Sequence, residues 1–203
     1  MIYKQVTVTV SGTTGKGHIS NDDSTWGGCY GAASGDSNGT GLLLRSERSS
    51  GNYQVKRCLL PVDTSSIPVY AYILSAKLQL YLTEKINNIG NGIIYIVSPT
   101  TQASLSSISN ADFNDCGGST NAYLENAYLT LNAYNDFIIS NPNSVIQKAS
   151  TTKFGIREYW EYTGTFPTSQ NTNSYVFENG DGTNKPKLVI TYALYGTMLP
   201  MTF

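Results

Sequence analysis

The sequence predicts an all-β protein, an antiparallel β-sandwich with one or two short helical turns. Three observations predict it. Segments with apolar residues at every second position recur along the chain, turns rich in Gly, Ser and Asn separate them, and strands do not alternate with helices. A chain of 203 residues can bury a sizeable core as one domain, and we expect that domain to span residues 1–194.

The first strands are predicted from alternation. Residues 3–10 (YKQVTVTV) alternate apolar and polar side chains, and residues 41–47 and 53–60 form a strand pair around a Ser-Ser-Gly-Asn turn. Between them, residues 12–41 hold many of the glycines and predict a long Gly-rich loop with one short strand near residues 17–20. A loop of this length is typical of a functional or contact segment.

The most regular strand signal lies in the middle of the chain. Ala76, Leu78, Leu80 and Leu82 alternate with polar side chains over residues 75–83. This pattern predicts a strand with one face on the core and the other in water.

Signals for short helices and for a central strand follow. Residues 92–98 are apolar on both faces, which favours a strand in the middle of a sheet. Ser109 with Asp112 three residues later predicts a single helical turn, with Ser109 as its N-cap. Asn141-Pro142 predicts the start of a second short helix.

Three more strands are expected near the C-terminus, at residues 152–162, 174–180 and 185–194. The last two are joined by the Gly-rich segment 179–184, a turn of the kind that hairpins use.

Composition argues against several classes of partner. Lys and Arg number 13 against 14 Asp and Glu, for a formal net charge of −1, so we expect neither the basic stripe of a nucleic-acid binder nor a polybasic membrane patch.

Three cysteines, Cys29, Cys58 and Cys116, rule out a complete disulfide framework, and Cys58 within an apolar strand fits a buried small hydrophobe. Abundant Tyr, Gly, Ser, Thr and Asn are typical of extracellular and virion β-proteins.

Four segments, in this order, carry a resemblance to a known family. Residues 57–68 (RCLLPVDTSSIP) resemble an R-x-x-L-x-F-D-x-S-x-I-P opening, and residues 73–81 (ILSAKLQLY) resemble the I-x-S-A-x-L-x-L strand that follows it. Residues 133–137 (AYNDF) with 152–158 (TKFGIRE) resemble a Y-N-x-F … T-K-x-G-x-R pair. Residues 186–192 (PKLVITY) resemble a P-K-L-x-V-x-Y closing strand.

Together these segments resemble the DNRLRE-type jelly-roll domains, which are relatives of carbohydrate-binding modules. The resemblance covers roughly residues 15–192, and Val62 departs from it where the pattern has an aromatic residue. Such domains occur in secreted bacterial and archaeal surface proteins and, in the Y-N-x-F form, in structural proteins of tailed phages. The resemblance implies a jelly-roll sandwich in which residues 57–62 and 73–82 are scaffold strands and Asp63 bonds to amides of its own turn.

The sequence does not indicate catalysis. Its one histidine, His18, lies in a Gly-rich region with no nucleophile and acid that the sequence singles out beside it. Glu158 and Glu161 are three residues apart, which on a strand puts them on opposite faces rather than facing one another as a glycosidase pair. We therefore expect a protein that is not an enzyme.

Aromatic residues are the best candidates for a binding surface. Trp26 and Tyr30 lie in the long loop, and Tyr159 and Tyr162 lie at the end of a predicted strand. Sugar rings stack on exposed aromatic side chains, so these four are candidate glycan-binding residues. Trp160 shares the face of the predicted strand that points to the core.

A structural calcium ion is the one cofactor considered, with Asp22, Asp23 and Asp181 as candidate ligands. Relatives of this kind often carry such an ion, but the three acids lack EF-hand spacing and plain turn chemistry explains them equally well.

The last residues of the chain form an apolar, uncharged tail over residues 195–203. Two interpretations remain open: a tail folded back on its own sandwich, or a tail docked on a neighbouring chain. We favour docking, with these residues as the contact: Tyr195, Met198, Leu199, Met201 and Phe203.

These observations and the resemblance predict a non-enzymatic structural protein on the exterior of a tailed-phage virion, as capsid decoration or tail- or fibre-associated jelly-roll. Its expected partners are other virion proteins and copies of itself, with no nucleic acid and no membrane. The alternative is a carbohydrate-binding module that attaches to host or extracellular glycans, either on the virion or at a cell surface.

Overall fold

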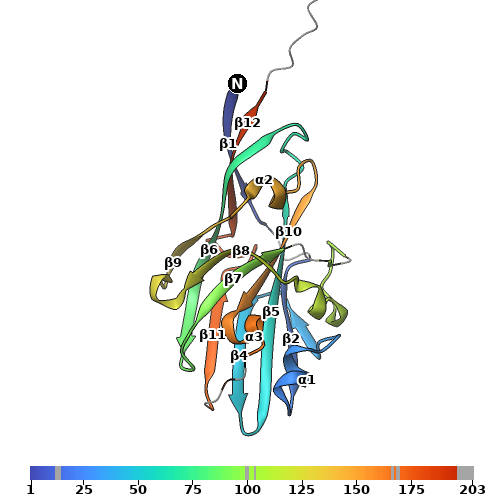
Figure 1. The fold of residues 1–203 in the computed structure, drawn as a ribbon, viewed down its shortest axis with the longest axis vertical. Helices are drawn as coiled ribbons and strands as arrows, with labels where there is room; N and C mark the ends of the chain where they lie inside the picture. The colour runs from blue at the N-terminus through green and yellow to red at the C-terminus, as the bar shows by residue number, and fades with distance from the viewer. Residues whose placement is uncertain (12–14, 99–100, 103, 166, 168–169, 196–203) are drawn as a thin grey trace, which may run out of the picture.

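The computed structural model describes residues 1–11, 15–98, 101–102, 104–165, 167 and 170–195. Strands account for 51% of the described residues and helices for 13%, which confirms the prediction of an all-β fold with short helical turns (Figure 1).

The strands are numbered in chain order. They are β1 (Ile2–Thr9), β2 (Gly17–Asp23), β3 (Ser37–Gly39), β4 (Leu42–Ser49), β5 (Asn52–Asp63), β6 (Tyr72–Asn87), β7 (Ile93–Ser98), β8 (Ser119–Glu125), β9 (Ala133–Ile138), β10 (Thr151–Glu158), β11 (Thr172–Phe177) and β12 (Lys187–Leu194). The short helices are α1 (Trp26–Tyr30), η1 (Asn110–Cys116), η2 (Asn126–Tyr128), α2 (Pro142–Val145) and α3 (Tyr159–Thr163).

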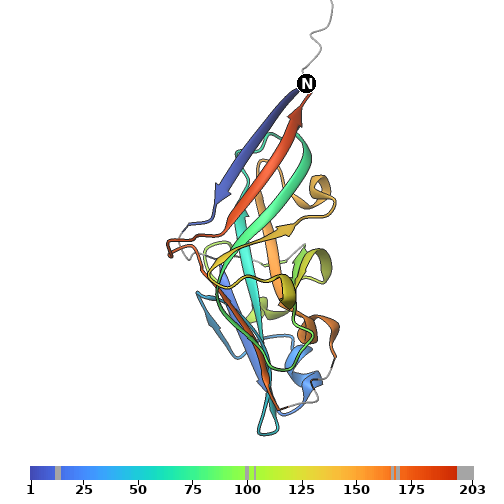
Figure 2. The same ribbon diagram turned by 90° about the vertical axis from the view of Figure 1, so that its left-hand side faces the viewer.

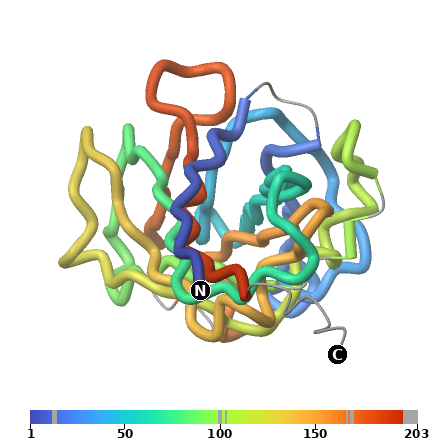
Figure 3. Tube along the Cα trace, turned by 90° about the horizontal axis from the view of Figure 1, so that it is seen from above, coloured from blue at the N-terminus to red at the C-terminus, as the bar shows by residue number. Residues whose placement is uncertain are grey.

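Two long strands, β5 and β6, change partners along their length. The first part of β5 pairs with β4 and β2, and its last part pairs with β10. The beginning of β6 pairs with β12, its middle with β9 and its end with β11. The main path through the described strands is β1-β12-β6-β11-β4-β5-β10-β7-β8, antiparallel at each step. The sheet therefore curls around a core, as the view along the molecule shows (Figure 3).

The main core lies inside this curled sheet. The alternation over residues 75–83 is confirmed, because every second side chain of β6 is buried while the side chains between them are partly exposed. The predicted core residues of β6 and β12 are all buried: Ala76, Leu78, Leu80, Leu82, Leu188, Ile190 and Tyr192.

A second, smaller core lies on the other face of β5. Side chains alternate between the faces of a strand, so Val55 and Leu59 point away from Cys58 and Leu60, which belong to the main core. Segments outside the sheet cover this face. The buried members of the second core are Ile19, Trp26, Cys29, Tyr53, Val55, Leu59, Val97, Phe113 and Cys116.

Three local predictions are confirmed. The carboxylate of Asp112 accepts a hydrogen bond from the Ser109 amide at 2.7 Å, and η1 begins at the next residue after Ser109. Helix α2 begins at Pro142. The carboxylate of Asp63 accepts a hydrogen bond from the Ser65 amide at 2.9 Å, which holds the turn that follows β5.

The strand expected over residues 152–162 is wrong after Glu158. The carboxylate of Glu158 accepts a hydrogen bond from the Trp160 amide at 3.1 Å, which caps a new helix, α3, and Gly164 ends that helix with φ of 66°. Trp160 therefore does not share the inward face of β10 with Phe154, and its side chain is half-buried outside the main core.

Two expectations about connections are also corrected. Residues 174–180 overlap β11 and residues 185–194 contain β12, but these strands pair with successive parts of β6 and not with each other. The Gly-rich segment 179–184 thus lies beside the middle of β6, between the β11 pairing that ends at Leu82 and the β12 pairing that begins at Gln79, instead of closing a hairpin. The Gly-rich loop 12–41 holds regular elements, β2, α1 and β3, and β2 pairs with β5.

Strand β1 lies at the edge of the sheet and pairs only with β12 among the described strands. The two run side by side to one end of the molecule, where the N-terminus lies (Figure 2). Residues 1–5 are exposed there. Within the described ranges, no helix combines the length and apolar character that crossing a membrane requires.

Candidate functional site

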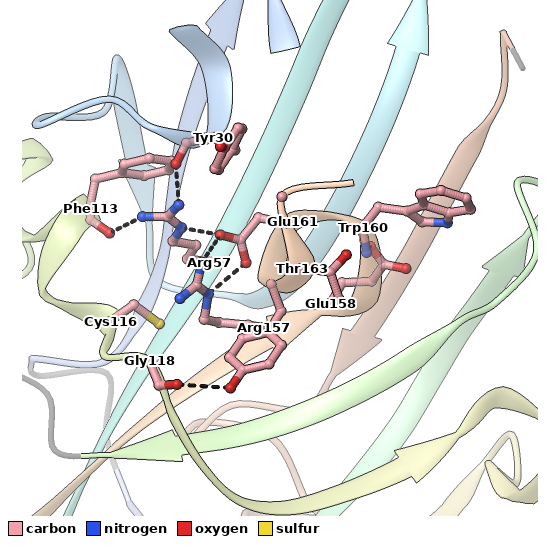
Figure 4. A network of polar contacts seen from close by, with 12 residues as sticks. Tyr30, Arg57, Phe113, Cys116, Gly118, Arg157, Glu158, Trp160, Glu161 and Thr163 are labelled. Carbon is pink, nitrogen blue, oxygen red and sulfur yellow. Dashed lines mark hydrogen bonds and ion pairs between the residues drawn. The ribbon is translucent and has the colours of Figure 1, made fainter. Parts of the chain in front are cut away.

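A buried ion network joins the two arginines of the family-like motifs. Arg57 lies on β5, Arg157 lies at the end of β10, and Glu161 on α3 lies between them (Figure 4). Nε of Arg57 donates to Oε1 of Glu161 at 2.6 Å, and Nε of Arg157 donates to Oε2 at 2.8 Å. The Glu161 side chain is fully buried, and the side chains of Arg57 and Arg157 are 4% and 13% exposed.

The surroundings of Glu161 favour its ionised form. Burial alone would raise the pKa of the Glu161 carboxyl, but the neighbouring guanidinium groups of Arg57 and Arg157 hold that pKa below its ordinary value. Glu161 therefore remains a carboxylate and is tied up by its two partners.

The remaining donors of the arginines bind backbone carbonyls outside the sheet. Arg57 donates to the carbonyls of Phe113 (2.9 Å) and Tyr30, and Arg157 donates to the carbonyl of Gly117 at 2.8 Å. The Arg57 guanidinium also lies 4.0 Å from the centre of the Phe113 ring. The network thus fastens the segments after α1 and along η1 to the sheet, which is a structural role.

Glu158 is a second buried acid, and it faces the other way from Glu161. Its carboxylate accepts hydrogen bonds from the Ser46 hydroxyl and, at 3.0 Å, from the Asn173 side chain. Burial outweighs these bonds and raises the pKa of Glu158 to about 7. Each acid is occupied by its own partners, so the two do not form an opposed pair around an open space.

The histidine has structural contacts as well. His18 lies on β2, half-buried, and its Nδ1 is 2.8 Å from the carbonyl oxygen of Gly41. Burial lowers the pKa of His18, so the neutral ring is favoured near neutral pH.

Trp26 was expected to be an exposed loop aromatic, and this is wrong. Its side chain is 5% exposed, its Nε1 donates to the carbonyl of Gly164 at 3.0 Å, and its ring lies 5.7 Å from that of Tyr30. Helix α1 turns the indole toward the second core, so Trp26 packs there and cannot offer a face to a sugar. Tyr30 is half-buried beside it.

Tyr162 and Tyr159 lie on another part of the surface. Tyr162 stacks on Tyr95 with ring centres 4.4 Å apart, and Tyr95 lies 6.2 Å from Tyr123, its cross-strand neighbour on β8. We call Tyr123, Tyr95 and Tyr162 the tyrosine strip. Tyr123 is 59% exposed. Sequence reasoning missed Tyr95 and Tyr123, although each is an aromatic residue in a short strand.

Beside the tyrosine strip, Tyr159 lines a polar groove of about 500 Å³. Ile93 on β7 and Glu125 on β8 are opposite each other in the sheet, and both line this groove. Each is two residues along its strand from the paired residues Tyr95 and Tyr123, so all four side chains lie on the same face of the sheet. Amide side chains complete the wall: Asn87, Asn91 and Asn126. Planar amides, a carboxylate and an aromatic ring are groups that suit a hydroxyl-rich ligand.

Asp22 and Asp23 end strand β2, and Asp181 lies in the segment between β11 and β12. Oδ1 of Asp23 accepts hydrogen bonds from the amide and hydroxyl of Thr25, at 2.7 and 2.9 Å. Asp22 and Asp181 lie in exposed positions. Across the part of the chain that the structure describes, no three His, Cys, Asp or Glu side chains come together so that they could hold a metal ion. Cys29, Cys58 and Cys116 are buried free thiols.

Of the predicted assembly residues, only Tyr195 falls within the described residues, and its side chain is 56% exposed. Met198, Leu199, Met201 and Phe203 lie outside them. Tyr195 follows β12 at the end of the molecule where β1 begins, since Ile2 pairs with Leu194.

Other exposed apolar side chains gather at the same end. Tyr3 and Tyr72 are the two neighbours of Ala193 in the sheet, one on β1 and one on β6. We call these residues the apical patch: Met1, Ile2, Tyr3, Val69, Tyr70, Tyr72, Leu74 and Tyr195, which are between 44% and 67% exposed.

No protein-family model matches the sequence, and no curated protein matches it. Among solved structures, the chain is similar to one in the cryo-EM structure of mud crab tombus-like virus, with 9% identity and a TM-score of 0.31. That similarity covers 98% of this chain and 85% of the other. At this TM-score the likeness supports no conclusion about function.

Proposed function

We propose that the protein is a non-enzymatic structural component of the exterior of a tailed-phage virion, where it assembles with copies of itself and with other virion proteins. The resemblance of its four ordered segments to DNRLRE-type domains supports the phage setting. The observation that carries the assembly role is the apical patch together with the uncharged tail that continues from it.

The physical argument rests on where apolar area is exposed. Scattered apolar side chains are normal on a protein surface, but a contiguous group at one end marks an interaction site. The apical patch surrounds the point where β12 ends, and residues 196–203 add four large apolar side chains, Met198, Leu199, Met201 and Phe203, and no charged side chain. A virion subunit contacts its neighbours many times over, so modest interfaces suffice when copies are held together on one particle.

Deletion of residues 196–203 tests the assembly role. The pairings of β12 end at Leu194, so the shortened chain keeps all described strand contacts and should fold. Size-exclusion chromatography with light scattering should show assemblies for the full chain and monomers for the shortened one. A shortened chain that unfolds, or that assembles like the full chain, would contradict the proposal. Antibodies against the chain should also label the outside of intact phage particles.

Glycan binding is a second candidate function, favoured by the tyrosine strip and the groove lined by Tyr159. If the site binds sugars, Tyr159→Ala and Tyr123→Ala should each weaken binding on a glycan array while the melting temperature changes little. Tyr128→Ala is a matched control, because Tyr128 is also highly exposed but lies in neither the strip nor the lining of the groove. An array on which the full chain binds no glycan would exclude this role.

A further inference from the structure

The groove beside the tyrosine strip is built from segments that lie far apart in the sequence. Its walls are the end of β6 with the turn into β7 (residues 87–93), the end of β8 with η2 (residues 125–127), and Tyr159, the first residue of α3. Its volume of about 500 Å³ accommodates a ligand of roughly one or two sugar rings.

The turn that forms one wall is held in place by side chains from two other elements. Asn173, which is buried on β11, accepts a hydrogen bond from the Ile89 amide at 2.9 Å through Oδ1 and donates to the Gly90 carbonyl at 3.0 Å through Nδ2. Nε1 of Trp160 on α3 donates to the same carbonyl at 3.0 Å. Because this wall is ordered before a ligand arrives, binding costs little conformational entropy.

Backbone groups along the walls already have partners. The Asn88 amide donates to the Thr172 carbonyl at 3.1 Å, and the Gly92 carbonyl accepts from the Asn126 amide at 2.6 Å. Strand β7, which begins directly after Gly92, pairs with β8 on one side and with β10 on the other. The walls thus do not present the open strand edge that an extended peptide would need, and a ligand must be held by side chains.

The floor of the groove is polar and tightly built. Gly92 has no space for a side chain, because a Cβ there would collide with the Tyr175 hydroxyl and lie 2.6 Å from Oδ1 of Asn87. That Oδ1 atom is buried and accepts no hydrogen bond from the residues that the structure describes. A buried acceptor without a donor is costly, so the Asn87 amide gains a bond when it turns toward a ligand hydroxyl.

Aromatic rings lie within the groove and next to it. Tyr159 is half-buried, and its ring packs edge-on against that of Trp160 with centres 5.4 Å apart. Tyr123 is highly exposed and is two residues along β8 from Glu125, a distance of about 7 Å. A ligand that occupies the groove and also reaches Tyr123 therefore has more than one ring.

The charge of the groove is negative. Among the described residues that line it, Glu125 alone carries a charge, and it is exposed and forms no ion pair with another described residue. Lys85 lies outside the lining, and its Nζ donates to the carbonyls of Asn126 and Leu129 at 2.7 and 2.8 Å. A carboxylate without a counter-charge accepts hydrogen bonds from hydroxyl groups and repels a second acid.

We infer that the groove and the tyrosine strip bind a neutral, hydroxyl-rich oligosaccharide and that Glu125 makes the site reject oligosaccharides that carry acidic groups. This inference rests on the proposed glycan-binding role and names the class of glycan. One sugar stacks on Tyr159 in the groove, where its hydroxyls donate to Glu125 and Asn87, and a further sugar contacts Tyr123. A carboxylate, sulfate or phosphate on the sugar in the groove would lie beside Glu125 and be repelled.

A matched pair of ligands tests this selectivity. The neutral hexose oligosaccharide that gives the strongest signal on a glycan array is compared, by isothermal titration calorimetry at low salt, with the same oligosaccharide after oxidation of its C6 hydroxymethyl groups to carboxylates. The neutral form should bind the unmodified chain about fivefold or more tightly, because two like charges in contact repel one another. Raising the salt concentration should reduce this ratio, because ions in solution screen the repulsion.

Two variants assign the selectivity to one side chain. Glu125→Gln keeps an oxygen acceptor and removes the charge, so the ratio of the two affinities should fall to near one. Glu84→Gln is the matched control, because it removes the same charge at an exposed position of β6 outside the lining of the groove, and the ratio should persist.

The outcomes separate this inference from the role on which it rests. If the unmodified chain binds neither neutral nor acidic glycans, the glycan-binding role fails and the inference fails with it. If the chain binds acidic oligosaccharides as tightly as neutral ones, or more tightly, the role stands and the selectivity is wrong. A ratio that Glu125→Gln leaves unchanged, or that Glu84→Gln reduces to the same extent, would also overturn the inference.

Discussion

At the scale of single residues, buried charge determines how the second core is held together. Glu161 draws Arg57 and Arg157 together although they lie 100 positions apart in the sequence. Each side chain would be costly to bury alone, and each is compensated by its partners. Removing Glu161 would leave two buried guanidinium groups without a counter-charge, and removing either arginine would leave the buried carboxylate with one partner instead of two.

Arg57→Ala should lower the free energy of unfolding by about 3–5 kcal/mol, because it removes one partner of a fully buried carboxylate. Arg45→Ala is the matched control. Arg45 lies 3.4 Å from Glu47 with its side chain 30% exposed, and loss of such a pair costs under about 1 kcal/mol. Urea unfolding measures both, and equal effects for the two variants would refute the structural role of the network.

Glu158 makes stability depend on pH in the opposite sense from a typical ion-paired acid. Its pKa is about 7 in the fold against an ordinary value of 4.5. Between these two values the unfolded chain has lost the Glu158 proton while the folded chain keeps it. The contribution of Glu158 to stability is thus full below pH 4.5 and falls as pH rises toward 7, at up to about 1.4 kcal/mol per pH unit.

Glu158→Gln should remove this dependence while keeping an oxygen acceptor for Asn173 and Trp160. Subtracting the unfolding free energy of the variant from that of the unmodified chain should give a difference that declines from pH 5 to pH 7 and is flat above it. A difference that does not change with pH would show that Glu158 is ionised in the fold across this range.

At the scale of elements, local signals were predictive where the element depends on its own sequence. The alternation of β6, the capping of η1 by Asp112 and the turn at Asp63 all follow from residues close together in the chain. Contacts between segments that lie far apart in the sequence could not be predicted from the sequence pattern. Trp26 is held in its buried position partly by a hydrogen bond to Gly164, which is distant in the sequence. Strands β11 and β12 each pair with β6 and not with each other, and the sequences of β11 and β12 alone do not reveal this.

The candidate site was likewise predictable from the sequence only in part. Tyr159 and Tyr162 could be picked out as aromatic residues at a strand end, but their surroundings come from β7, β8 and the end of β6. The pattern also gives no sign that Glu161 joins Arg57 to Arg157, because it predicts a strand through residue 162 where the structure has α3. Only the motif resemblance marks both arginines.

Helix α1 supplies the test of the second core. Trp26→Ala should lower the free energy of unfolding by about 3–5 kcal/mol, because it truncates a large buried side chain. Tyr128→Ala, at a side chain 71% exposed, should change it little. Chemical denaturation compares the two. If the Trp26→Ala protein is as stable as the unmodified chain, Trp26 is not part of the second core. It would then again be a candidate glycan-binding residue.

At the scale of the whole molecule, charge and exposed apolar area are unevenly distributed. The net charge of −1 gives little long-range repulsion between copies. The apical patch and the open edge of β1 lie at one end, so association at that end would not cover the tyrosine strip on β7 and β8. Assembly and glycan binding are thus compatible on one subunit.

Association that buries this end should make thermal stability depend on concentration. A contact formed only by the folded chain adds to its stability by mass action, so the melting temperature of the full chain should rise as protein concentration rises. The chain shortened after Tyr195 should melt at one temperature at all concentrations, because its described strand pairings are complete but its tail is gone. Calorimetry over a hundredfold range of concentration makes the comparison. Ser24→Trp, a substitution at an exposed position between β2 and α1, is a control that should behave like the full chain. A full chain whose melting temperature does not change over that range would mean that the apical patch and the tail do not join copies in solution.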